Sequence, residues 1–311
     1  MSQPCIAVLM GGDSGEAEVS RTSAKGVIEA LRENFADVHG IEADKNLMQS
    51  LQDAVPDLIF PILHGPPGED GTLQGFLDIL GYQYVGSGVQ ASAFAMDKIV
   101  AKAIFRSAGL PVIDDCIVQR GEDMIAAAAT IEQTLGDYVV IKPASQGSAL
   151  GITLIDKAGQ LAEGMAAAFD YDDRLLVERR IDGREMTVGV LDTDTGSDAF
   201  PVIEITTPGD SWYDFEHRYT KGLSEHLMPA DLPDEQTKSL QQIAVAAHQA
   251  LGCRDMSRAD FIVKDKDIYL LEVNTLPGMT PLSLYPDGAR GYGLDFPALC
   301  KYLVERAASR S

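Results

Sequence analysis

The stretch from Ser257 to Leu284, SRADFIVKDKDIYLLEVNTLPGMTPLSL, constrains this chain more than any other. Two apolar segments flank a polar turn at 264–267, which predicts an antiparallel hairpin. Glu272 and Asn274 are two residues apart on the second strand, so their side chains point to one face. If Asp260 lies beside them on the first strand, three oxygen ligands that suit a hard cation such as Mg²⁺ converge. A solvated hairpin edge is the alternative for this pattern taken alone.

The charge balance bears on the class of partner. The chain has 25 basic and 47 acidic residues, a net charge of −22. This argues against nucleic acid or an anionic membrane as the main partner. Anionic small substrates remain compatible, because a few placed Lys and Arg side chains make a local positive pocket.

Cysteine usage and hydropathy bear on the compartment. The four cysteines lie far apart and form no C-x-x-C pair; they are Cys5, Cys116, Cys253 and Cys300. Buried free thiols in a reducing compartment are expected, rather than a thiolate metal site. The chain shows no basic leader with a long apolar core and no apolar run of about 18 residues. We therefore expect a cytoplasmic protein.

The first third has the pattern of an α/β sheet. A buried apolar run at 5–10, a Gly11-Gly12 turn and helical spacing at 18–31 predict a strand, a turn and a helix. The dinucleotide fingerprint G-x-G-x-x-G fails in both registers, because Met10 breaks one, and Asp13 with Glu16 breaks the other. A nicotinamide-dependent dehydrogenase is therefore disfavoured.

A second loop follows the apolar run at 57–62. It reads HGPPGEDGTLQG and precedes a predicted helix that begins at Thr72. Loops in this position bind ligands in open α/β sheets. His64, beside Glu69 and Asp70, is either part of a capping cluster or a polar scaffold for a substrate pocket.

The middle third carries two basic candidates for phosphate binding. Lys98 begins a predicted helix, and Lys142 ends a strand in YVVIKPASQGSALGITLI. This is not a Walker loop, because the lysine precedes the glycines and a strand follows. The loop N–H groups and Ser148 can still cover phosphates above Lys142, although a plain flexible hairpin is the alternative. The strand-like segment 175–181 resembles a hinge that presents backbone groups to a purine.

The last third combines strands, a long irregular segment and two helices. Segments 185–191 and 199–206 predict strands, and 234–251 and 295–307 predict helices. Residues 207–230 carry aromatic and charged side chains without periodicity. Such a segment in a compact protein is typical of a functional lid.

Taken in order, these motifs resemble the ATP-grasp superfamily and, within it, the D-alanine–D-alanine ligase family. The resembling segments span nearly the whole chain: GGDSGEAEVS, LHGPPGEDGTLQG, MDK, IKPASQGSALGI, the 213–219 loop, SRADF and LLEVNTLPGMTPLSL. The family phosphorylates one D-alanine on its carboxylate, and the amine of a second D-alanine then attacks the acyl phosphate. ATP and D-alanine are thus the expected substrates.

The resemblance also implies residue roles. For ATP these are Lys98, Lys142, Ser148 and Arg218 at the phosphates, Glu178 and Ile181 at the adenine, Glu185 at the ribose, and Asp260, Glu272 and Asn274 on two Mg²⁺ (or Mn²⁺) ions. For catalysis and amino-acid binding they are Glu16 at the first ammonium, His64 in the substrate pocket, Arg258 with the Gly278 N–H at the oxyanion, Ser283 and Leu284 at the second carboxylate, and Ser148 with Tyr219 closing over the substrates.

The fold implied is α/β, with an α+β C-terminal part, in three domains. We expect an N-terminal parallel-sheet domain at 1–95, a central domain at 96–180 and a C-terminal domain with the lid and metal site at 181–311. The two later domains would enclose ATP between their sheets. The resemblance further suggests a homodimer.

One departure and three alternatives remain. The family commonly carries Lys before the lid tyrosine, where this chain has Arg218, a planar fork in place of a point charge. Tyr219 favours dipeptide synthesis over ligation to D-lactate. The alternatives are a D-alanine–D-lactate ligase, another ATP-grasp carboxylate–amine ligase, and a module that binds ATP without turnover.

Overall fold

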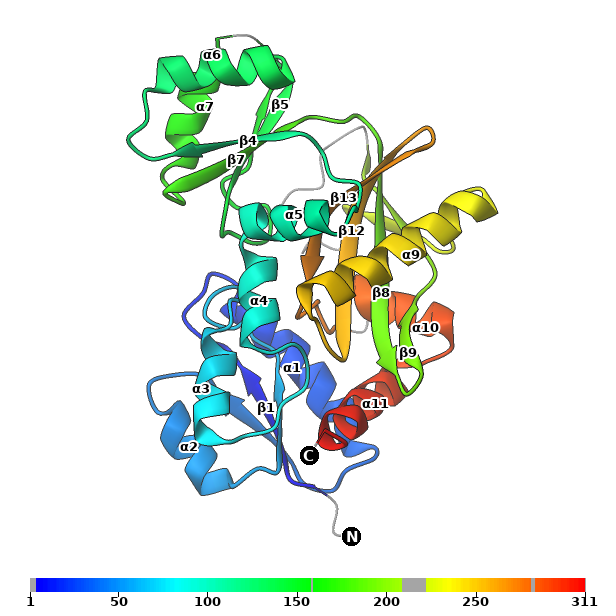
Figure 1. Cartoon of the computed structure of the whole chain (residues 1–311). Helices are drawn as coiled ribbons and strands as arrows, with labels where there is room; N and C mark the ends of the chain where they lie inside the picture. The colour runs from blue at the N-terminus through cyan, green and yellow to red at the C-terminus, as the bar shows by residue number, and fades with distance from the viewer. Residues whose placement is uncertain (1–3, 158, 209–221, 281–282, 311) are drawn as a thin grey trace.

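A computed structural model describes residues 4–157, 159–208, 222–280 and 283–310. Three sheets organise this part of the chain, and each is built from one continuous third of the sequence. In Figure 1 the N-terminal sheet lies at the bottom, the smallest α/β unit at the top, and the large sheet between and beside them.

The N-terminal sheet is parallel, with strand order β2-β1-β3. Its strands are β1 (Ile6–Met10), β2 (Val38–Glu42) and β3 (Leu58–Pro61), and its helices are α1 (Ala17–Arg32), α2 (Leu47–Ala54) and α3 (Thr72–Leu80). The strand and helices expected at 5–10, 18–31 and from Thr72 are confirmed. Because the strands are parallel, the loops after β1 and β3 leave the same edge of the sheet.

The upper unit is a four-stranded antiparallel sheet, order β4-β7-β5-β6. Its elements are β4 (Asp115–Gln119), α6 (Met124–Leu135), β5 (Val139–Pro143), β6 (Thr153–Ile155), α7 (Leu161–Ala168) and β7 (Arg174–Arg179). Alternate side chains such as Val139, Ile141 and Val177 form a core beneath α6 and α7. The other face turns toward the rest of the molecule (Figure 1).

The third sheet has six strands, in the order β11-β10-β8-β12-β13, with β9 paired to β8. Its strands are β8 (Arg184–Thr193), β9 (Gly196–Ala199), β10 (Ile203–Thr206), β11 (Glu225–Leu227), β12 (Met256–Lys264) and β13 (Asp267–Asn274). The prediction of one strand at 199–206 is wrong, because β9 ends at Ala199 and β10 begins at Ile203. Pro201 lies in the gap and has no N–H to donate to a neighbouring strand. β11 also falls within the segment expected to be wholly irregular.

Five further helices lie before, between and after the strands of the large sheet in the described sequence. They are α4 (Val89–Met96), α5 (Lys98–Ser107), α9 (Asp234–Leu251), α10 (Leu284–Tyr292) and α11 (Phe296–Ala308). Asp97 caps α5, since its carboxylate accepts hydrogen bonds from the N–H groups of Ile99 and Val100, each at 3.1 Å. Gly252 at φ 73° ends α9 in the left-handed region.

The C-terminal helix returns to the start of the chain. α11 packs beside α1 (Figure 1), and the buried Leu303 belongs to the same core as Val27. α5 packs on the large sheet rather than under α6 and α7, since Phe105 shares a core with Val188. The division of the chain at 95/96 and 180/181 stays a prediction.

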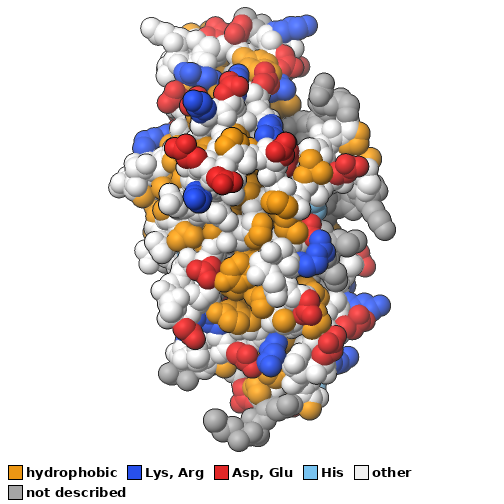
Figure 2. Space-filling view, turned by 90° about the vertical axis from the view of Figure 1, so that its right-hand side faces the viewer, with side chains coloured by type: hydrophobic (Ala, Val, Ile, Leu, Met, Phe, Trp, Pro, Cys, Tyr) orange, Lys and Arg blue, Asp and Glu red, His pale blue; other side chains and the backbone are white. Residues whose placement is uncertain are grey.

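On the face shown in Figure 2, lysine and arginine side chains are spread among acidic ones, with apolar side chains between them.

Shortening a buried side chain of α11 should weaken the whole fold. Leu303 is fully buried, so Leu303→Ala is expected to lower the free energy of unfolding by about 2–5 kcal/mol. Urea unfolding followed by circular dichroism measures this. Lys301→Ala, on the exposed side of the same helix, should change it by less than about 0.5 kcal/mol. Equal losses in the two variants would contradict this packing of α11.

Candidate active site

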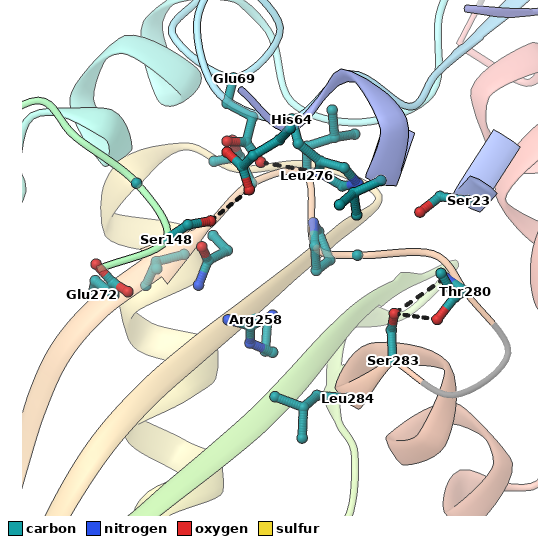
Figure 3. Close-up of a pocket in the computed structure, with 18 of the residues that line it drawn as sticks. Ser23, His64, Glu69, Ser148, Arg258, Glu272, Leu276, Thr280, Ser283 and Leu284 are labelled. Atoms are coloured by element: carbon teal, nitrogen blue, oxygen red, sulfur yellow. Dashed lines mark hydrogen bonds and ion pairs between the residues drawn. The ribbon is translucent and has the colours of Figure 1, made fainter. Parts of the chain in front are cut away.

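A cavity of about 780 Å³ lies where the three sheets meet. Its walls come from the loops after β1, β3 and β5, from β12 and β13, and from the start of α10. Figure 3 shows Glu272 and Ser148 at one side of this space, Ser283 and Leu284 at the other, and Arg258 between them in this view. Residues far apart in sequence therefore face one volume.

The β12–β13 hairpin brings the predicted metal ligands together. Asp260 lies directly opposite Glu272, and Arg258 lies opposite Asn274, with a bulge after Asp260. The Asn274 amide donates to Asp260 Oδ2 at 3.2 Å. Thr187 on β8 donates to Asp260 Oδ1 at 2.6 Å, which holds the carboxylate in place.

These three side chains fit a hard divalent cation. The set offers two carboxylates and one amide oxygen on neighbouring strands, the donor chemistry that Mg²⁺ prefers. Positive charge is already favoured here: Arg258 donates to both oxygens of Asp260, at 2.9 and 2.8 Å, and Lys98 Nζ lies 3.4 Å from Glu272 Oε2. The expected convergence of Asp260, Glu272 and Asn274 is present.

The two lysines predicted to bind phosphate come from different elements and have different partners. Lys98, the first residue of α5, donates to the Gln146 carbonyl at 2.6 Å. Lys142, near the end of β5, lies 2.5 Å from Glu178 Oε2. Burial would by itself lower the pKa of Lys142, but the charge of Glu178 and then Glu272 outweighs burial and raises it. The raised pKa favours the protonated, positively charged form of Lys142.

The loop after β5 reaches across to the N-terminal sheet. Ser148 and Ala149 adopt φ values of 48° and 61°, which are uncommon for residues with a side chain. The Ser148 hydroxyl donates to Glu16 Oε1 at 2.5 Å, across 132 positions of sequence. Glu16 immediately precedes α1. Strained backbone held by a long-range contact is typical of functional loops.

His64 forms a buried corner of the cavity. Its Nδ1 lies 3.7 Å from Glu69 Oε1, and its buried Nε2 has no hydrogen-bond partner among the described residues. Burial would lower the pKa of His64, but the carboxylates of Glu69 and then Glu16 raise it above its usual value. Nε2 is thus a donor suited to a bound carboxylate.

The far end of the cavity is the start of α10. Ser283 is the residue before the helix, and its Oγ lies 2.7 Å from Thr280 Oγ1. A Cβ at Gly278 would lie 3.1 Å from Ser283 Oγ, so a larger residue would crowd this end. Free N–H groups at the start of a helix bind anions such as carboxylates.

Comparison with known proteins identifies the family of the chain. Residues 41–87 match the family described as "D-ala D-ala ligase N-terminus", and residues 104–305 match "D-ala D-ala ligase C-terminus". This chain belongs to the D-alanine–D-alanine ligase family.

Individual members of the family resemble the chain over its whole length. Proteins named D-alanine--D-alanine ligase from Halalkalibacterium halodurans and Geotalea uraniireducens are 45% and 44% identical to it. The first alignment covers 96% of this chain and 97% of that protein, and the second covers 97% and 95%.

A solved structure shows the same fold. The crystal structure of D-alanine--D-alanine ligase from Bacillus anthracis complexed with ATP has a TM-score of 0.85 and 29% identity, covering 99% of this chain and 98% of that one. The expected ATP-grasp fold with an N-terminal parallel sheet is thereby confirmed.

Some residues to which the family resemblance assigns a role lie outside the described residues. Glu178, another of them, has a neighbour that the sequence analysis did not name. Arg218 and Tyr219 fall in the undescribed part of the lid segment. Ile181 follows β7, and Glu185 lies near the start of β8. Lys102, one turn after Lys98 on α5, contacts Glu178. The sequence signal for Lys102 was its place on the apolar face of a predicted helix, where a charge requires a partner.

No helix in the described ranges is both long and apolar enough to cross a membrane.

The raised pKa of His64 predicts a pH-dependent stability. A group whose pKa is higher in the folded state stabilises the fold fully below its unfolded value, about 6.5, and this stabilisation is lost as pH rises through the folded value. As the pH rises from 5.5 to 8.5, the free energy of unfolding, measured with urea, should therefore fall more for the wild type than for Glu69→Gln. The neutral amide of that variant no longer stabilises the imidazolium.

Glu163→Gln, an exposed position on α7, is the control and should follow the wild type. Identical pH profiles for Glu69→Gln and the wild type would show that Glu69 does not raise the pKa of His64.

Proposed function

We propose that this chain joins two D-alanine molecules into D-alanyl-D-alanine, with ATP converted to ADP and phosphate, for peptidoglycan precursor synthesis. The observation that carries the proposal is one cavity that joins three features. The hairpin with Glu272 and Asn274 lines it beside Lys98, together with Arg258 and a helix start that suits a carboxylate; Lys142 lies outside this lining and is paired with Glu178. The membership of the chain in the D-alanine–D-alanine ligase family supports the overall reaction.

In the first step, a carboxylate oxygen of the first D-alanine attacks the γ-phosphorus of ATP, and ADP leaves. Lys98 and Lys142 hold the phosphates and offset the charge that spreads over the transferring group. Glu16 receives the ammonium of this D-alanine, and His64 borders its carboxylate. Ser148, bonded to Glu16, covers the reacting atoms and excludes water.

Asp260, Glu272 and Asn274 would hold the divalent cations, two Mg²⁺ or Mn²⁺ by analogy with the family. When bound, these ions neutralise phosphate charge and orient the phosphoryl group.

In the second step, the amine of the other D-alanine attacks the acyl-phosphate carbon. The carbonyl oxygen becomes an oxyanion, and phosphate leaves as the carbonyl re-forms, taking the proton that the attacking nitrogen loses. Arg258 and the Gly278 N–H are placed to stabilise the oxyanion. Ser283 and the start of α10 at Leu284 receive the carboxylate of the attacking D-alanine.

The remaining assignments concern the nucleotide and the lid. Glu178 and Ile181 face the adenine, and Glu185 faces the ribose. Arg218 contacts phosphate, and Tyr219 closes over the substrates; both lie outside the described residues. We also propose a homodimer in the cytoplasm, where ATP is available and free thiols persist.

Removing one charge from the hairpin should abolish activity without unfolding the protein. In Glu272→Gln, ADP release with Mg-ATP and D-alanine should fall by on the order of 100-fold or more, because a neutral amide binds a divalent cation poorly. A coupled ADP assay measures it, with circular dichroism as the check of folding. Glu305→Gln, half-exposed on α11, is the matched control. Retained turnover in folded Glu272→Gln would remove the metal assignment.

The acceptor range should distinguish related activities. ADP release is expected with D-alanine but not with L-alanine, and mass spectrometry should find the dipeptide. Release that requires D-lactate as second substrate would indicate a depsipeptide ligase. Another productive amino acid would indicate a different carboxylate–amine ligase. ATP binding without release for any acceptor would contradict a ligase.

A further inference from the structure

Lys102 is a buried cation outside the reaction assigned above. Only 1% of it is exposed, and it projects from α5 toward the segment that connects α5 to β4. Its ammonium donates to the Ile113 carbonyl at 2.7 Å, contacts Glu178 Oε1, and lies 3.6 Å from Asp115 Oδ1. Each of its three N–H groups therefore has an oxygen within reach.

The two carboxylates beside it lie opposite each other on neighbouring strands. Asp115 on β4 is the direct partner of Glu178 on β7, and their side chains are 8% and 2% exposed. Like charges in this position repel, and in a desolvated place one of two such carboxyls takes up a proton. Lys102 places a positive charge within reach of both carboxylates.

Lys142 is the second cation on Glu178, at Oε2. In the proposed reaction Lys142 serves the phosphates of ATP, so Lys102 is the cation that remains dedicated to Glu178. Burial alone would raise the pKa of Glu178, but the charges of Lys142 and Lys102 outweigh burial and lower it. The contacts of Glu178 and the direction of its pKa shift therefore both indicate an ionised carboxylate.

We propose that Lys102 is a positioning residue that keeps Glu178 an ionised, acceptor-only group, and so makes the nucleotide site select a 6-aminopurine over a 6-oxopurine. This rests on the proposed function, in which Glu178 faces the adenine. An ionised carboxylate only accepts hydrogen bonds. It therefore pairs with the amino group of adenine and repels the carbonyl O6 of hypoxanthine or guanine, whereas a protonated carboxyl would donate to that oxygen.

The test compares ATP with inosine triphosphate in D-alanine ligation. In Lys102→Met the ratio of kcat/KM for ATP to that for inosine triphosphate should fall by about tenfold or more, as a site built for one hydrogen-bond pattern loses its discrimination. The KM for D-alanine should stay within about twofold, which a general loss of structure would not allow. An unchanged nucleotide ratio in the folded variant overturns the proposal.

Arg106→Gln is the matched control. Arg106 lies one turn further along α5, contacts Asp115 from the exposed side, and leaves the Lys102–Glu178 pair intact. Its nucleotide ratio should remain that of the wild type. If it falls as far as in Lys102→Met, the effect belongs to Asp115 and the proposal fails.

A double variant tests whether Lys102 acts through Glu178. Glu178→Gln alone should lower the ratio, since an amide can donate as well as accept. Adding Lys102→Met to it should change the ratio no further, because coupled residues are not additive. A further fall of similar size would show that Lys102 acts by another route.

A second variant and a binding measurement separate loss of folding and loss of turnover from loss of nucleotide selection. If Lys102→Met does not fold, Lys102→Gln replaces it, since its amide keeps a hydrogen-bond donor on the side chain while the charge is gone. The dissociation constants of ATP and inosine triphosphate, measured by calorimetry without D-alanine, give the same ratio independently of turnover. Wild-type protein that selects ATP but releases no ADP would refute the proposed function and leave this proposal to be decided by binding.

Discussion

The pairing of cations with carboxylates in and beside the cavity is the constraint on which the site depends. Arg258 pairs with Asp260, Lys98 with Glu272, and Lys142 with Glu178. A charge this far from water is costly unless it is paired and hydrogen-bonded. The groups expected to bind metal and phosphate thus also neutralise one another, so an incoming ligand exchanges existing ion pairs rather than filling a neutral space.

Long-range packing turns these pairs into one site. The hairpin belongs to the six-stranded sheet, and Lys142 and Glu178 lie on the four-stranded sheet, on the face away from α6 and α7. Glu16 and His64 follow strands of the N-terminal sheet. The contact between Ser148 and Glu16 joins the second and third of these units. Because α11 packs on α1, the C-terminal sheet and the N-terminal sheet share one core and hold the cavity between them.

Local patterns predicted most elements, and their failures have local causes. The helical spacing at 234–251 and the polar turn at 264–267 predicted α9 and the hairpin well, since periodicity and turn signals act within a few residues. The strand at 199–206 was divided at Pro201, and the helix α10 was not foreseen. The start of α10 follows a Gly/Pro-rich stretch with little periodicity, and its burial comes from partners such as Val190, whose carbonyl accepts from Tyr285 at 3.0 Å.

The sequence alone determined the chemistry available: the hairpin that places Glu272 and Asn274 on one face, the lysines at 98 and 142, and the family resemblance of the ordered motifs. The tertiary structure decided which groups meet. Only the fold places Lys102, on α5, between Asp115 and Glu178, and only burial leaves the Nε2 of His64 without a partner in the wall of the cavity. The reason is physical: residue spacing sets direction within one element, whereas burial and charge pairing depend on elements that only the folded chain brings together.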